Sequence, residues 1–194
     1  MSIKTIAIHL AGDAEQENRL QTSIDLARRL RAVLVGIYAT HGAGMPDGVA
    51  GRGASSAFLR EIEEATRERA TITRSLFERT CKSHALDHEW IAAPGEATRV
   101  LAAQSTVSDL LVLSKSGASL TGHLVAPHGP GEMAMEAACP VLVLPEGKTD
   151  HSIGRRILIG WKPTRPTGRA VRGSVALPIA ASRTGHSCGD RRAS

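Results

Sequence analysis

Apolar positions in the first 147 residues follow two patterns, continuous runs rich in Val, Ile and Leu and stripes that repeat every three or four residues. Continuous runs of this kind are typical of strands covered on both faces. They predict strands at 3–10, 33–39, 86–93, 109–114 and 139–145. The segments between them predict helices at 14–32, 56–85, 94–107 and 129–138.

Two of the predicted helices carry a clear apolar stripe. The first has its stripe at helical spacing, with Asp13 as a plausible N-cap. That stripe consists of Leu20, Ile24, Ala27 and Leu30. The second predicted helix is much longer, and mixed charges opposite its stripe indicate a solvated face. Its stripe consists of Phe58, Ile62, Ala65, Ile72, Leu76 and Cys81.

Strands that alternate with helices predict parallel strands joined by helical crossovers, and therefore an α/β domain with an open, doubly wound sheet. Ligands of such sheets bind beyond the carboxyl ends of the strands, where the strand order reverses. Those ends are expected at residues 11–13, 39–42 and 114–117.

Composition narrows the class of protein. At 194 residues, 42% of them hydrophobic, the chain is long enough for one well-packed domain. No apolar run approaches the length of a membrane span, and the N-terminus lacks the features of a signal peptide, so a cytoplasmic location is expected. Cys81, Cys139 and Cys188 are too few and too scattered for a disulfide framework, and reduced thiols are expected.

Charge is distributed unevenly along the chain. Residues 1–150 hold 15 Lys and Arg against 18 Asp and Glu, whereas residues 151–194 hold nine basic residues and one acid, Asp190. The mildly acidic body argues against a nucleic-acid-binding core. The basic tail could neutralise an acidic surface, but no aromatic residue follows Trp161 to stack on bases, so no specific nucleic-acid partner is expected.

A second unit begins after residue 150. The segment "GRRILIGWKPTR" repeats the pattern of the chain's start, "SIKTIAIHLAGD", and predicts a strand near 156–161. The pattern is then lost in a segment with Pro163, Pro166 and Pro178 and many small residues. We therefore expect a complete domain at 1–147 and, at 148–194, an incomplete second repeat with a basic, disordered tail.

Several stretches together resemble the universal stress protein (UspA) family, in its bacterial form with two tandem domains. They are "KTIAIHLAGD", "SIDLARRLRAVLVGIYA", "WIAAPGEATRVLAAQSTVSDLLVLSKSG" and "ACPVLVLP". The resemblance covers about residues 1–147 and implies five strands in the order 3-2-1-4-5 with helices on both faces. "RRILIGWKPTR" resembles the first strand of the second domain, after which a frameshift or premature end would explain the loss of pattern.

Nucleotide-binding members of this family end their fourth strand in G-x2-G-x9-G-[S/T], whose amide groups approach phosphate. Ungapped alignment places Ser114 and Gly117 at the first two glycines and Pro127-His128 at the final pair. Proline has no N–H to donate to an anion. A gapped alignment could recruit Gly122, Gly129 or Gly131, but the spacing then fails.

The family's acidic position after the first strand falls on Ala11, followed by Gly12. The resemblance therefore implies a degraded nucleotide site, in which backbone groups remain as candidate contacts. These candidates are Gly12, Ala39, Ser114, Gly117 and Gly129. No cofactor is expected, although ATP stays an alternative.

Other chemistry is weakly indicated. His9 lies near the end of the first strand, but the sequence places no acid beside it, and a buried, hydrogen-bonded histidine is the more common case. Lys115 could add charge beside Ser114 and Ser116. A metal site is not expected, because His84, His88 and Glu89 lack a third ligand on one face, and His123 and His128 lie in a loop.

These observations predict a non-catalytic stress-response binding or scaffold domain. One alternative is a regulatory switch that binds ATP or AMP. A second is an enzyme like the ATP pyrophosphatases, but "LAGDAEQ" lacks their paired glycine and serine. The family topology leaves the apolar last strand on a sheet edge, so we expect a homodimer through Val141, Leu142 and Val143, or poor solubility.

Overall fold

A computed structural model describes residues 2–40, 56–115, 130–147, 153–175, 177 and 181–188. Five parallel strands form one sheet in the order β3-β2-β1-β4-β5, which confirms the predicted α/β class and strand order. The strands are β1 (Thr5–His9), β2 (Val33–Ala39), β3 (His88–Ala93), β4 (Leu110–Ser114) and β5 (Val141–Leu144). Each coincides with a predicted apolar run.

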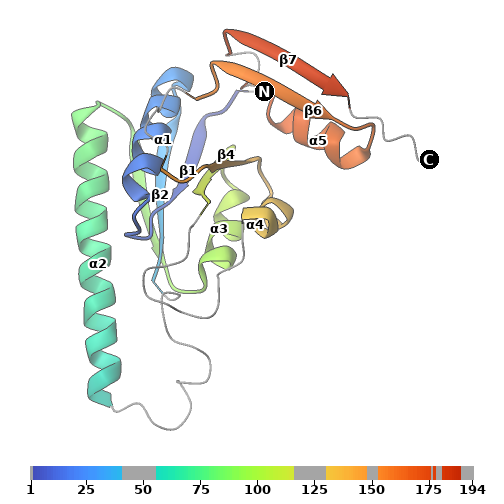
Figure 1. The fold of residues 1–194 in the computed structure, drawn as a ribbon. Coiled ribbons are helices and arrows are strands. Elements are labelled where there is room, and N and C mark those ends of the chain that lie inside the picture. The colour runs from blue at the N-terminus through green and yellow to red at the C-terminus, as the bar shows by residue number, and fades with distance from the viewer. Residues whose placement is uncertain are drawn as a thin grey trace.

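Helices cover both faces of this sheet (Figure 1). They are α1 (Gln16–Leu30), α2 (Ser56–Ser83), α3 (Ala97–Ser105) and α4 (Pro130–Glu136). Leu20 of α1 and Phe77 of α2 belong to one buried cluster, whereas Leu101 of α3 and Met133 of α4 belong to the other. Two apolar layers therefore enclose the central strands, as their continuous apolar runs require.

The start of α1 differs from the prediction. Glu15, not Asp13, precedes the first helical residue, and its side chain makes no capping hydrogen bond. Asp13 instead accepts a hydrogen bond from the Glu15 amide through Oδ1, at 2.9 Å. Its other carboxylate oxygen bonds Arg19, so this side chain serves a polar network rather than the end of the helix.

The predicted apolar side of α2 is partly wrong. Ala65 is exposed and Ile72 is 61% exposed, whereas Thr73, Phe77 and Cys81 are buried. A helix of 28 residues is about 42 Å long, whereas a strand of seven residues spans about 23 Å. The helix therefore extends beyond the sheet (Figure 1), and the buried side chains that the structure describes on it, Thr73, Phe77 and Cys81, lie in its second half.

Gly36 lets α2 approach the sheet closely. A Cβ atom at this position would lie 2.9 Å from Leu10 Cδ1 and 3.0 Å from ring atoms of Phe77. These separations are shorter than carbon–carbon contact distances, so a side chain at position 36 would force β2 and α2 apart.

A second, two-stranded parallel sheet follows the main domain. It consists of β6 (Arg156–Trp161) and β7 (Arg183–Cys188), with α5 (Arg165–Gly173) between them. β6 covers the residues for which the sequence predicts a strand. Composition predicted disorder after it, but the described part forms α5, with Thr164 capping the Thr167 amide and proline in the first turn, and β7, paired with β6.

None of the helices that the structure describes is both long enough and apolar enough to cross a bilayer.

Candidate functional site

The candidate site lies at the carboxyl ends of β1 and β4, where the chain leaves the sheet in opposite directions. β1 ends at His9 and β4 ends at Ser114. The strand order reverses between these two strands, which makes this edge the expected ligand position of an open α/β sheet.

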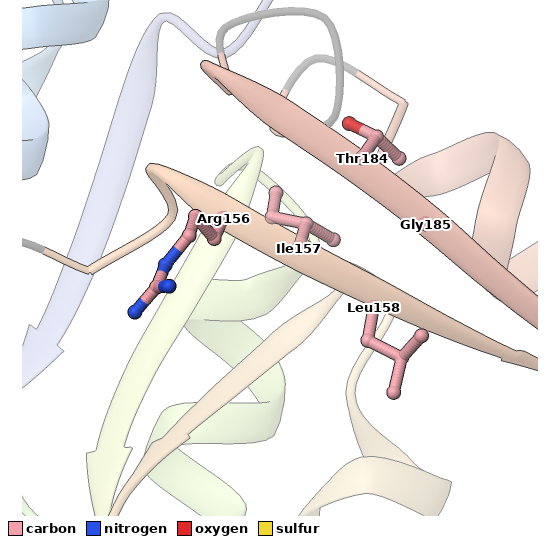
Figure 2. Close-up of a pocket in the computed structure, with 5 residues that line it drawn as sticks. All are labelled: Arg156, Ile157, Leu158, Thr184 and Gly185. Carbon is pink, nitrogen blue, oxygen red and sulfur yellow. The ribbon is translucent and has the colours of Figure 1, made fainter.

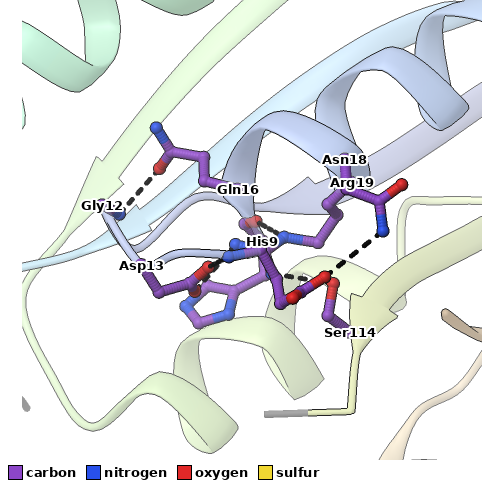
Figure 3. A network of polar contacts seen from close by, with 8 residues as sticks. His9, Gly12, Asp13, Gln16, Asn18, Arg19 and Ser114 are labelled. Atoms are coloured by element: carbon purple, nitrogen blue, oxygen red, sulfur yellow. Dashed lines mark hydrogen bonds and ion pairs between the residues drawn. The ribbon is translucent and has the colours of Figure 1, made fainter. Parts of the chain in front are cut away.

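Arg19 of α1 occupies this edge (Figure 3). Its side chain is 2% exposed. Its Nε donates to the His9 carbonyl, its Nη1 donates to Ser114 Oγ at 3.0 Å, and its Nη2 donates to Asp13 Oδ2 at 2.9 Å. The guanidinium therefore joins both strand ends to the loop after β1.

The neighbouring donors are also used within the chain. The Gly12 amide donates to Gln16 Oε1 at 2.7 Å, and the Glu15 amide donates to Asp13. Glu15 Oε1 accepts from the Gly147 amide at 3.2 Å, which links the start of α1 to the residues after β5. The amides of Gly12, Glu15 and Gly147 are therefore already bonded to side-chain oxygens.

His9 lies beneath this network and is neutral at pH 7. Burial, above all, and the positive charge of Arg19 lower its pKa to about 4, while Asp13 and Glu96 oppose this shift. The side chain is half-buried at the end of β1. Asn18 Oδ1 is buried and has no hydrogen-bond partner, although its Nδ2 donates to Glu15.

The structure brings together two of the five candidate nucleotide contacts. Ser114 joins the Arg19 network directly, whereas the Gly12 amide bonds the side chain of Gln16, whose own amide donates to the Asp13 carbonyl. Ala39 ends β2 next to Ala93 of β3, one strand away from β1. Gly117 and Gly129 lie outside the described residues, as do Ser116 and the loop histidines 123 and 128. Lys115 is exposed.

Sequence reasoning missed Arg19, Glu15 and Gln16. A signal was present for Arg19, because it lies one turn before Ser23 and two turns before Leu26, both on the buried side of α1. A cation at core spacing indicates a buried partner, since an unpaired buried charge is strongly disfavoured. The acid that it requires, Asp13, lies six residues earlier.

The structure adds little to the other chemical candidates. Within the described residues, no group of three or more His, Cys, Asp or Glu could hold a metal ion. His88 Nδ1 lies 2.9 Å from the Leu86 carbonyl, and its ring packs edge-on against Phe77. Burial raises the pKa of Cys81 to about 12 and that of Cys139 to about 11, which makes both poor nucleophiles.

Comparison with known proteins identifies the fold. No family model and no curated protein matches the sequence. Among solved structures, the universal stress protein UspA from Lactobacillus plantarum matches with a TM-score of 0.57 and 16% identity, over 74% of this chain and 99% of that one. A universal stress protein in complex with cAMP matches with a TM-score of 0.50 and 16% identity, over 74% and 98%.

One longer match includes the second sheet. A universal stress protein from Archaeoglobus fulgidus matches with a TM-score of 0.68 and 12% identity, over 96% of this chain and 68% of that one. At these identities, the matches establish that the chain has the universal stress protein fold.

Proposed function

We propose, starting from this fold, that the chain is a universal stress protein-like binding domain that acts without catalytic turnover. Its own side chains close the nucleotide site at the carboxyl ends of β1 and β4, which is called the nucleotide edge below. The observation that carries this proposal is the buried Arg19, bonded to His9, Asp13 and Ser114. A nucleotide at this position would have to separate Asp13 from the buried guanidinium of Arg19, and leaving a buried charge without its partner is strongly unfavourable.

Absence of turnover is supported by the state of the titratable groups at the edge. His9 is half-buried and neutral at pH 7, and Asp13 is held by Arg19 and the Glu15 amide. Neither group is placed to exchange a proton with a bound molecule. The function left to the domain is recognition of a partner through its surface.

The alternative function is a nucleotide-responsive switch. It is favoured by the structural neighbour that was solved in complex with cAMP and has the same fold. In that case Asp13 would release Arg19 when nucleotide binds, so that the guanidinium meets phosphate instead of carboxylate.

Titration calorimetry with ATP, AMP and cAMP separates the two functions. The closed-edge proposal predicts no binding tighter than about 1 mM, and a melting temperature that these nucleotides leave unchanged. Micromolar binding by the unaltered protein overturns it in favour of the switch.

Asp13→Ala tests whether this carboxylate closes the edge. The variant is expected to lose about 1–3 kcal/mol of stability, because a buried cation loses its partner. Any binding of nucleotide gained by Asp13→Ala identifies Asp13 as the closing group. Glu17→Ala is the matched control, since Glu17 is an exposed acid in the first turn of α1, four residues after Asp13, and it should change neither stability nor binding.

We further propose that β6, α5 and β7 repeat the β1-α1-β2 unit as the start of a second domain. The match that includes this segment covers 68% of the longer protein, which supports the proposal. Sequencing the gene and translating the other reading frames after residue 165 tests the frameshift explanation. Finding no apolar strand pattern in any frame contradicts it.

A further inference from the structure

The small sheet presents a free strand edge. In the large sheet, β1 pairs on one side with β2, to which α1 connects it, and on its other side with β4. In the small sheet, β6 pairs with β7 across α5, and no described strand lies at its other edge. Parallel sheets are normally covered on both faces, and a free edge exposes unpaired N–H and C=O groups that accept another strand.

An exposed apolar side chain lies on β6, and an open hollow lies over the pairing of β6 with β7. Leu158 of β6 is 75% exposed. A hollow of about 420 Å³ is lined by Arg156, Ile157, Leu158, Thr184 and Gly185. Figure 2 shows Arg156 and Leu158 on one side of β6 and Ile157 on the other, as strand alternation requires. A basic and an apolar side chain therefore flank one surface.

The charge of this unit has one sign. The described residues from 153 to 188 include seven basic residues and no acid. Four of them, Arg155, Arg156, Lys162 and Arg172, have exposed side chains. Such a surface attracts a negatively charged partner and repels a second copy of itself.

The unit is fixed to the main domain, so its edge has a defined position. Arg29 of α1 donates through Nη1 to the Ile153 carbonyl and pairs with Asp25 at 3.4 Å. Ile153 and Leu177 pack against the buried cluster beneath α1 and α2. These contacts hold the segment before β6 and the segment between α5 and β7, whereas Leu158 stays exposed.

We propose that the free edge of β6 binds an acidic polypeptide segment in extended conformation, which adds to the small sheet as a third strand. Main-chain hydrogen bonds supply the pairing, an apolar side chain of the segment packs on Leu158, and its carboxylates meet Arg156 and the neighbouring basic residues. The edge of β6 would be the surface through which the domain carries out the binding function proposed for it, away from the nucleotide edge. The peptide proposal rests on that function only in identifying this surface with it.

A polypeptide fits the surface better than a nucleic acid does. An exposed leucine beside an unpaired strand edge matches a peptide strand, whereas nucleic acid would use the charge alone. Arg156 and Leu158 lie on the same face of β6, because residues two apart on a strand share a face. The bound segment must therefore present a carboxylate and an apolar side chain on one face, two residues apart, while backbone pairing holds the register.

The experiment uses the full chain and a labelled nine-residue peptide, Glu-Val-Glu-Val-Leu-Val-Glu-Val-Glu, which places the central Leu and the Glu side chains on one face. Fluorescence anisotropy is expected to show saturable binding of this peptide. Methylating the amide nitrogens of two adjacent central residues removes a donor from each edge and leaves the charge unchanged, so affinity should fall about tenfold or more. Equal binding of the two peptides overturns strand addition, and so does no binding at about 1 mM peptide.

Arg156→Glu is expected to weaken peptide binding about tenfold, whereas Arg60→Glu, at an exposed position of α2, should change it less than about twofold.

Hydrogen exchange gives a second readout that does not depend on the variant's folding, because the peptide should protect amides of residues 157–161. Unchanged exchange there contradicts the proposal. Tighter binding of a single-stranded DNA oligonucleotide, lost in Arg156→Glu, replaces it with a general polyanion surface. The peptide experiments do not depend on nucleotide binding, so their outcome is independent of the calorimetric test of the proposed function.

Discussion

The imidazole of His9 makes the stability of the domain depend on pH. Its pKa is about 4 in the folded protein, against 6.5 for an unperturbed histidine. As pH falls below 6.5, the unfolded chain binds a proton that the folded chain does not accept until about pH 4. The contribution of His9 to stability is therefore complete above pH 6.5 and is lost between these two values.

We predict that this loss amounts to about 3 kcal/mol, because each unit of pKa difference corresponds to about 1.4 kcal/mol. Urea unfolding at several pH values measures it. His9→Leu should remove this part of the decline, so the difference in stability between the variant and the wild type should change with pH from 6.5 to 4. A constant difference across that range contradicts the assigned state of His9.

At the level of elements, the packing of α2 on β2 depends on Gly36. We predict that Gly36→Ala destabilises the protein by about 1–3 kcal/mol, because the added methyl overlaps Leu10 and Phe77. Gly131→Ala is the control: a Cβ there meets nothing within 4 Å, so alanine in α4 should be neutral or slightly stabilising. Thermal unfolding of the two variants compares them, and equal stability would show that α2 adjusts without cost.

The sequence predicts the strands of the large sheet well, because burial of both faces of a strand alone determines its apolar pattern. Val33–Ala39 is a strand because both of its faces are buried, and its apolar run states this directly. The prediction of the buried side of α2 was partly wrong, because the sequence does not say how far a helix extends beyond the sheet. Ile72 was assigned to the core and Phe77 was not. The Arg19 network joins residues up to 95 positions apart, which local spacing cannot relate.

For the whole molecule, the edge strand β5 raises the question of self-association. β5 pairs with β4 alone among the described strands, and Val143 is 39% exposed. Exposed apolar edges favour pairing with another chain. We therefore keep the prediction of a homodimer formed through Val141, Leu142 and Val143.

Sedimentation at micromolar concentration tests this assembly. Val143→Lys should shift the protein from dimer to monomer, since a charged side chain on an edge strand opposes pairing. Val107→Lys is the matched control, because Val107 is 74% exposed and lies on no strand, and it should leave the dimer intact. A soluble monomer in the wild type contradicts the prediction.

The placement of the indole side chains gives the molecule two separate optical reporters. The chain has two tryptophans, Trp90 in β3 and Trp161 in β6, so each sheet carries one. Trp90 stacks on Tyr38, the single tyrosine, at 5.9 Å between ring centroids, and also contacts Phe77. With Trp161 replaced by phenylalanine, emission follows the large sheet alone, and with Trp90 replaced it follows the small one. Loss of the two signals at one denaturant concentration would mean that the sheets unfold together.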